Sequence, residues 1–229
     1  MLPYSVVAAA TPCGSRWLVA SAKMHAVTFA PEAPKLYPTF IEILEERPSF
    51  SVIVMNAALG FRDDLRTGVR TCDREARSLL GRRGSAVHNA PTRMSLKEGA
   101  TRSESGLDAV TWVLMPKYRE VADEMSPYRQ RVVYGGNPEL SYYTLNGDRP
   151  LRWSKKIEEG RRERRRILEN KIPGINKVID VELGGQTKKH LLDVAALLWT
   201  SRRVFGHAAV RLPFEAEWDS EGLRMEMVY

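Results

Sequence analysis

A short stretch near the middle of the chain brings an acid close to a strongly basic segment. Glu139 follows Pro138, so it lies in the first turn of a predicted short helix, where the helix dipole favours an acid. The predicted helix 154–170 carries seven cations and three acids within residues 155–166, a balance of +4. A carboxylate beside a cationic surface is what a protein that handles a phosphate backbone needs. A capping acid beside a solvated helix has the same pattern, so both interpretations stay open.

Part of this positive charge is expected to be used within the helix itself. Glu158 and Glu159 are neighbours of Arg162 at 3.6 residues per turn, which favours ion pairs along one helix face. The cations predicted to be freer are those of Arg161, Arg164 and Arg165. The candidate nucleic-acid contacts are Lys155, Lys156, Arg161, Arg164 and Arg165.

A second candidate acid, Asp193, lies beside the apolar face of the predicted helix 188–205. A partly buried aspartate needs a partner, and Lys189 is expected to pair with it from one turn earlier on the same face. His190, three residues before Asp193, is a candidate base or metal ligand. A functional role for Asp193 and a structural ion pair with Lys189 explain the pattern equally well.

Composition narrows the class of protein and its partners. A net charge of +7 favours polyanions as partners. No apolar run approaches the roughly 20 residues of a membrane span, so no membrane partner is expected. Cys13 and Cys72 make neither a disulfide framework nor a zinc ligand set, which fits a reducing cytoplasm. Cys72 is expected to cap a helix, because no histidine lies near it in sequence to activate a thiolate.

The elements that must position these residues alternate between strands and helices. Apolar runs predict strands at residues 5–10, 17–22, 27–30, 50–55, 131–134 and 223–229. Helical spacing predicts helices at residues 38–46, 73–80, 107–121 with a kink at Pro116, 154–170 and 188–205. The polar stretch 82–103 is expected to be a long excursion. This order predicts an α/β fold with a mixed sheet flanked by helices, in one domain over residues 1–229.

Seven segments together resemble the predicted RNase H-like nuclease family known as domain of unknown function 429. They occur in the family's order and cover nearly the whole chain. The segments are CGSRWLVA (13–20), CDREARSLLGRRGSAVHNAP (72–91), LMPKYREVAD (114–123), NPELSYYTLNG (137–147), SKKIEEGRRER (154–164), LLDVAALLWTSRR (191–203) and GLRMEMVY (222–229).

The resemblance implies an RNase H-like fold whose carboxylates hold Mg²⁺ or Mn²⁺ for phosphodiester hydrolysis. It implies acids after the first strand and after the central strand, a glutamate in the NPE motif, and acids on the last helix. This chain has Thr11 and Asn56 at the two strand positions, and only Glu139 and Asp193 remain as candidate metal ligands. We therefore expect a degenerate metal site with weak affinity for Mg²⁺ or Mn²⁺.

Three functions are compatible with these residues, and whether the protein is an enzyme stays open. The first is a metal-dependent nuclease whose activity is weak or lost. The second is a non-catalytic relative that binds nucleic acid or a protein through the same face. The third is a metal-free pocket in which Lys189, His190 and Asp193 act on a small anionic substrate. The candidate catalytic residues are Thr11, Asn56, Glu139, Lys189, His190 and Asp193.

Overall fold

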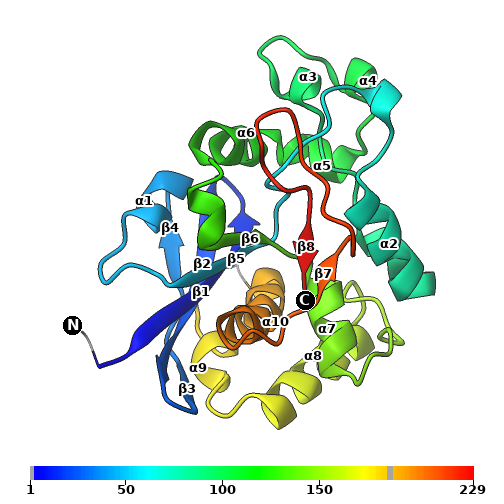
Figure 1. The fold of residues 1–229 in the computed structure, drawn as a ribbon. Coiled ribbons are helices and arrows are strands. Elements are labelled where there is room, and N and C mark those ends of the chain that lie inside the picture. The colour runs from blue at the N-terminus through cyan, green and yellow to red at the C-terminus, as the bar shows by residue number, and fades with distance from the viewer. Residues whose placement is uncertain (1–2, 185–187) are drawn as a thin grey trace.

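A mixed β-sheet forms the centre of the protein (Figure 1). The computed structural model describes residues 3–184 and 188–229, except for the side chains of Lys188 and Lys189. The strands β1 (Ser5–Cys13), β5 (Val52–Met55) and β6 (Val133–Gly135) are parallel to one another, whereas β2 (Arg16–His25) runs antiparallel to β1. The protein therefore has an α/β fold with a mixed sheet flanked by helices.

Short strands complete the sheet at its margins. The strands β3 (Thr28–Pro31) and β4 (Lys35–Tyr37) both pair antiparallel with β2. Near the C-terminus, β7 (Arg211–Leu212) and β8 (Met227–Val228) form a two-stranded sheet. A parallel bridge between Gly136 and Val228 attaches this small sheet beyond β6.

Small apolar residues in β1 allow helices to pack closely on both faces of the sheet. Val7 and Ala9 point to one face, and Ala8 and Ala10 point to the other, because successive side chains in a strand alternate. All four are completely buried. A strand that is apolar on both faces is expected at the centre of a sheet covered by helices on both sides.

Helices cover the two faces of the sheet (Figure 1). The face that carries Val7 is covered by α10 (Lys188–Phe205), with α7 (Pro138–Leu145), α8 (Glu158–Lys171) and α9 (Asn176–Ile179) packed around it. The opposite face is covered by α1 (Phe40–Leu44) and α6 (Met115–Glu124). A third apolar cluster joins α2 (Thr71–Leu80) to α7 and to the two C-terminal strands.

The remaining elements are short. They are the α-helices α3 (Arg93–Leu96), α4 (Arg102–Ser105) and α5 (Ala109–Val113), and the 3₁₀ helices η1 (Leu65–Thr67), η2 (Gly81–Ala86) and η3 (Arg129–Arg131). The polar stretch 82–103, expected to be an excursion, is thus partly helical, and α3 begins with a capping box at Thr92. No helix among the described residues has the length and apolar character needed to cross a membrane.

Most predicted elements are confirmed, and three predictions were wrong in an informative way. The predicted kink at Pro116 is a break, because α5 ends at Val113 and Pro116 lies in the first turn of a new helix, α6. The basic helix begins at Glu158, four residues later than predicted. Cys72 does not cap α2; it is the second residue of that helix, and Arg70 is the capping residue.

The centre of the sheet is predicted to dominate stability. Val54 is completely buried in β5 between β1 and β6, so Val54→Ala should lower the free energy of unfolding by about 2–3 kcal/mol through lost burial and a residual cavity. Val27→Ala, at an almost fully exposed position, is the matched control and should change it by less than about 0.5 kcal/mol. Urea unfolding measures both, and equal effects would contradict this account of the core.

Candidate functional site

The parallel strands β1 and β5 bring Thr11 and Asn56 together near their carboxyl ends. Asn56 directly follows β5, and its backbone N–H donates to the carbonyl of Ala10 at 2.8 Å. Its side-chain Nδ2 donates to Thr11 Oγ1 at 3.0 Å. Thr11 is buried. Two neutral side chains that satisfy each other therefore occupy the strand positions where the family resemblance implies acids.

The next parallel strand, β6, leads directly to Glu139. Asn137 caps α7 by accepting a hydrogen bond from the Glu139 backbone N–H at 2.9 Å, and its own side-chain amide donates to the carbonyl of Ala86 at 3.3 Å. This confirms the predicted position of Glu139 in the first turn of a helix. Glu139 is buried, so its carboxylate needs a charged or hydrogen-bonding partner inside the protein.

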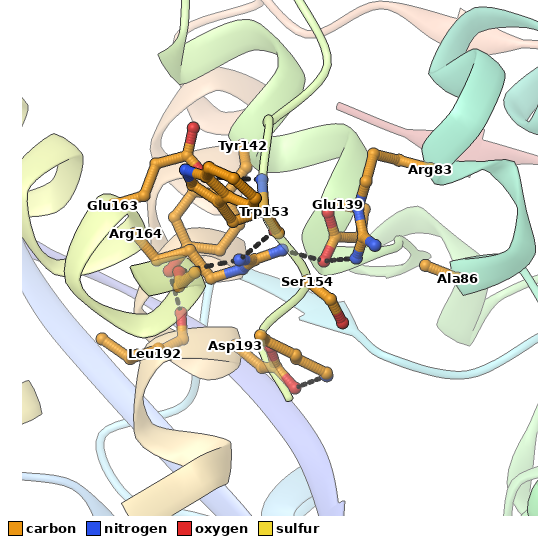
Figure 2. Close-up of polar contacts among 12 residues, drawn as sticks. Arg83, Ala86, Glu139, Tyr142, Trp153, Ser154, Glu163, Arg164, Leu192 and Asp193 are labelled. Carbon is orange, nitrogen blue, oxygen red and sulfur yellow. Dashed lines mark hydrogen bonds and ion pairs between the residues drawn. The ribbon is translucent and has the colours of Figure 1, made fainter. Parts of the chain in front are cut away.

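Two arginines bind the carboxylate of Glu139 (Figure 2). Arg164 Nη2 donates to Glu139 Oε1 at 2.5 Å, and Arg83 Nη2 contacts the same oxygen at 3.3 Å. The prediction that Arg164 is free to contact phosphate was wrong, because its side chain is 0% exposed. Glu139 and Arg164 are 25 residues apart in sequence, and helical periodicity gives no information about such a pair.

Arg164 has further partners that fix its position. Its Nη1 donates to the carbonyl of Gly160 at 2.8 Å and to that of Trp153 at 3.0 Å. Its guanidinium lies 5.3 Å from the centre of the Tyr142 ring, a favourable cation–π distance. Arg164 therefore connects α7, α8 and the segment before α8 inside the core.

The second acid, Asp193, also has a cation as its partner. Lys155 Nζ lies 2.5 Å from Asp193 Oδ2, and Asp193 is buried while the lysine side chain is 44% exposed. We expected Lys189 to be this partner; it belongs to α10, but its side chain lies outside the described residues. Among the described residues, the partner of Asp193 is Lys155, from the segment before α8. His190 lies on α10 one turn before Asp193.

Both acids affect the pKa of the buried Tyr142. Its hydroxyl donates to the carbonyl of Leu192 at 2.8 Å. Burial raises the pKa of Tyr142 well above its ordinary value, the negative charges of Asp193 and Glu139 raise it further, and Arg164 opposes them. Glu139, Asp193 and Arg164 are therefore close enough to form one electrostatic unit around this ring.

Residues 151–157, which we call the strap, cross the site immediately before α8. The backbone N–H groups of Arg152 and Trp153 each donate to the carboxylate of Glu163 at 3.0 Å. Gly160 allows the closest approach, because a Cβ atom there would lie 2.0 Å from the carbonyl oxygen of Ser154. The strap is thus held against α8 and carries Lys155 to Asp193 (Figure 2).

The exposed cations of α8 are mostly neutralised. Arg161 and Arg162 both bind Glu158, at 2.8 and 3.0 Å, the second being the pair expected from helical spacing. Arg165 binds Glu169 and Asp180, at 2.9 and 2.7 Å. The prediction that Arg161 and Arg165 are freer was therefore wrong. A cavity of about 340 Å³ beside α8 has balanced charge, with lining residues that include Glu158, Arg161, Arg162, Arg165, Asp180 and Glu182.

The arrangement does not fit a divalent metal ion. Within the described part of the chain, no three His, Cys, Asp or Glu side chains are grouped as a metal site requires. Glu139 and Asp193 are matched by three cations, those of Arg83, Arg164 and Lys155, which leaves a local charge of +1. Glu139 Oε2 and Asp193 Oδ1 are buried without a hydrogen-bond partner, but the other oxygen of each carboxylate is bound to a side-chain cation, and these positive charges repel a divalent ion.

Two residues of the site, Arg83 and Trp153, were not predicted from the sequence. Arg83 was missed, although it lies in the family-like segment 72–91, and Trp153 was missed because one exposed aromatic gives no periodic signal.

Cys72 is completely buried, and burial raises the pKa of its thiol to about 12, with Arg70 opposing and Asp73 assisting the shift. This excludes the thiolate that a nucleophile requires near neutral pH.

The protein has an α/β fold, and the charges of the two acids in its site, Glu139 and Asp193, are compensated by side-chain cations. The chain matches the model of the family described as Protein of unknown function (DUF429) over residues 12–217. It therefore belongs to this family, as the sequence segments predicted. Comparison with curated proteins and with solved structures found no match.

The buried ion pair makes a sharp prediction about stability. Arg164→Met leaves the Glu139 carboxylate buried with only the longer contact to Arg83, so it should lower the free energy of unfolding by about 3–5 kcal/mol. Adding Glu139→Leu removes the uncompensated charge and should recover at least half of that loss. Arg166→Met, at an exposed position of the same helix, is the control. Urea unfolding that shows no recovery in the double variant would contradict a charge-based role.

Metal binding is predicted to be absent. Titration calorimetry with Mn²⁺ should detect no specific binding into the millimolar range, because the cations bound to both carboxylates repel a divalent ion. Asp193→Asn serves as the control for binding elsewhere on the surface. A wild-type binding signal that disappears in Asp193→Asn would show that Lys155 gives way to a metal and would restore the nuclease hypothesis.

Proposed function

We propose that this DUF429 protein binds nucleic acid at the edge of its sheet and does not hydrolyse it. The observation that carries the proposal is the charge balance at the two buried acids: among the described side chains, Arg83, Arg164 and Lys155 compensate Glu139 and Asp193 with one positive charge in excess. Such a site attracts phosphate rather than a cation. Any binding of Mg²⁺ or Mn²⁺ is accordingly weak in this proposal.

We also propose that the fold is RNase H-like. Support comes from the antiparallel pairing of β3, β2 and β1, followed by the parallel pairing of β5 and β6. Further support comes from the position of Thr11 and Asn56 at the edge where the family resemblance implies acids. The scaffold would then be that of a nuclease in which neutral and cationic side chains have taken the place of the metal site.

The cations available to a phosphate lie on the strap. Lys155 is partly exposed while it holds Asp193, and Lys156 is exposed with no carboxylate partner among the described residues. A net charge of +7 adds long-range attraction for a polyanion. Both cysteines are buried and neither is in a disulfide, which supports a location in the reducing cytoplasm.

Binding should depend on salt in a way that identifies the contacts. For a fluorescently labelled single-stranded oligonucleotide, the logarithm of the binding constant should fall linearly with the logarithm of salt concentration, with a slope of about −0.7 for each phosphate contacted. Lys156→Gln should make the slope less steep by about 0.7. Lys97→Gln is the control, because Lys97 follows α3 at the far end of the molecule from α8 (Figure 1). Fluorescence anisotropy measures all three proteins.

Two results would overturn the proposal. Absence of oligonucleotide binding at low salt would remove nucleic acid as the partner and favour the small-anion pocket. Cleavage of the oligonucleotide in Mn²⁺ that is lost in Glu139→Gln would show that catalysis survives despite the bound arginines.

A further inference from the structure

An indole ring lies exposed on the strap next to the proposed phosphate contacts. Trp153 is 40% exposed, although an indole has one of the largest apolar surfaces of any side chain. The guanidinium of Arg152 lies 4.8 Å from the centre of the ring. The ring therefore has a cation stacked against it and still presents a large surface to solvent.

The backbone that carries this ring is fixed on both sides. The N–H groups of Arg152 and Trp153 are bound by Glu163, and the Trp153 carbonyl accepts from the completely buried Arg164. Glu163 and Arg164 are consecutive residues of one helix, so the strap cannot shift independently of α8. A ring presented on a rigid backbone loses little conformational entropy when a ligand stacks on it.

The cations around the ring follow the pattern of a single-strand binding surface. Arg152 precedes Trp153, and Lys155 and Lys156 follow it within three residues. Proteins that bind single strands without sequence preference combine cations that follow the backbone with aromatic rings on which bases stack. The strap provides both within six residues.

A second exposed tryptophan shows why stacking alone does not define such a site. Trp218 is 54% exposed, and the guanidinium of Arg224 lies 5.5 Å from its ring centre. However, its neighbours in sequence are Glu217 and Asp219, and Glu221 follows. These acids are paired with Arg62 and Arg93, so Trp218 has the same ring and the same stacked cation in a setting without excess positive charge.

We propose that Trp153 is a stacking site for one base of a single-stranded nucleic acid, with Lys155 and Lys156 contacting the adjacent phosphates. The ligand class is a single strand, because a base inside a duplex has no free face for the indole. This inference rests on the proposed function, and it adds which side chain recognises the base.

The test separates the base from the phosphates. Affinities for labelled oligothymidylate and for an abasic oligodeoxynucleotide of equal length are measured with the wild type, Trp153→Ala, Trp153→Phe and Trp218→Ala. Trp153→Ala should weaken oligothymidylate binding roughly 10- to 100-fold and leave abasic binding unchanged. Trp153→Phe, which keeps a stacking ring, should retain affinity within a few-fold of the wild type. Trp218→Ala should have no effect on either ligand.

A fluorescence readout keeps the test decisive if Trp153→Ala fails to fold. Oligothymidylate should quench tryptophan emission in the wild type, and this quenching should be lost in Trp153→Phe. Unchanged quenching in Trp153→Phe, or equal losses on the two oligonucleotides in Trp153→Ala, would overturn the stacking site while the proposed function stands. Absence of oligothymidylate binding by the wild type would overturn both.

Discussion

The buried pair of Arg164 and Glu139 is the interaction on which the site depends. Neither side chain reaches bulk water, so each needs the other to offset the cost of leaving it. Through this pair, α8 is fixed to the first turn of α7, and through the Trp153 carbonyl it also fixes the strap. The position of Lys155 opposite Asp193 follows from the position of the strap.

Side-chain cations compensate the charge of the two buried acids in this site. Buried carboxylates need positive charge nearby, and a divalent ion or basic side chains can provide it. A metal leaves coordination positions open for water and substrate, whereas guanidinium and ammonium groups donate hydrogen bonds and do not act as Lewis acids. In the proposed function, these acids therefore remain in place without supporting hydrolysis.

The sequence predicted the helices and strands better than it predicted which side chains contact one another. The helix 188–205 matches α10, and the helix 73–80 matches most of α2, because their apolar spacing and their terminating residues are local signals. The neutral residues Thr11 and Asn56 at the ends of two strands were also visible in the sequence. The strand β4 escaped prediction because it has only three residues. That the chain forms a single domain stays a prediction.

Long-range pairing accounts for the remaining errors. The pattern of α8 placed Arg164 among charged neighbours, and only the packing of α7 against α8 shows that it is buried. Lys155 was assigned to a helix face, but it precedes the helix and reaches Asp193, 38 residues away. Only residues near Asp193 in sequence could be proposed as its partner, and the predicted pairing with Lys189 lies outside the described residues. Contacts of this kind require the three-dimensional structure.

The hydrogen bonds between α8 and the strap determine how the strap can move. Glu163 holds the strap by its backbone N–H groups and Arg164 holds it by a carbonyl, so two consecutive residues fix it from two directions. Such a segment has no hinge of its own. The strap can therefore move away from the site only when α8 itself opens, which makes its movement an event of local unfolding, governed by helix stability and not by the motion of a lid.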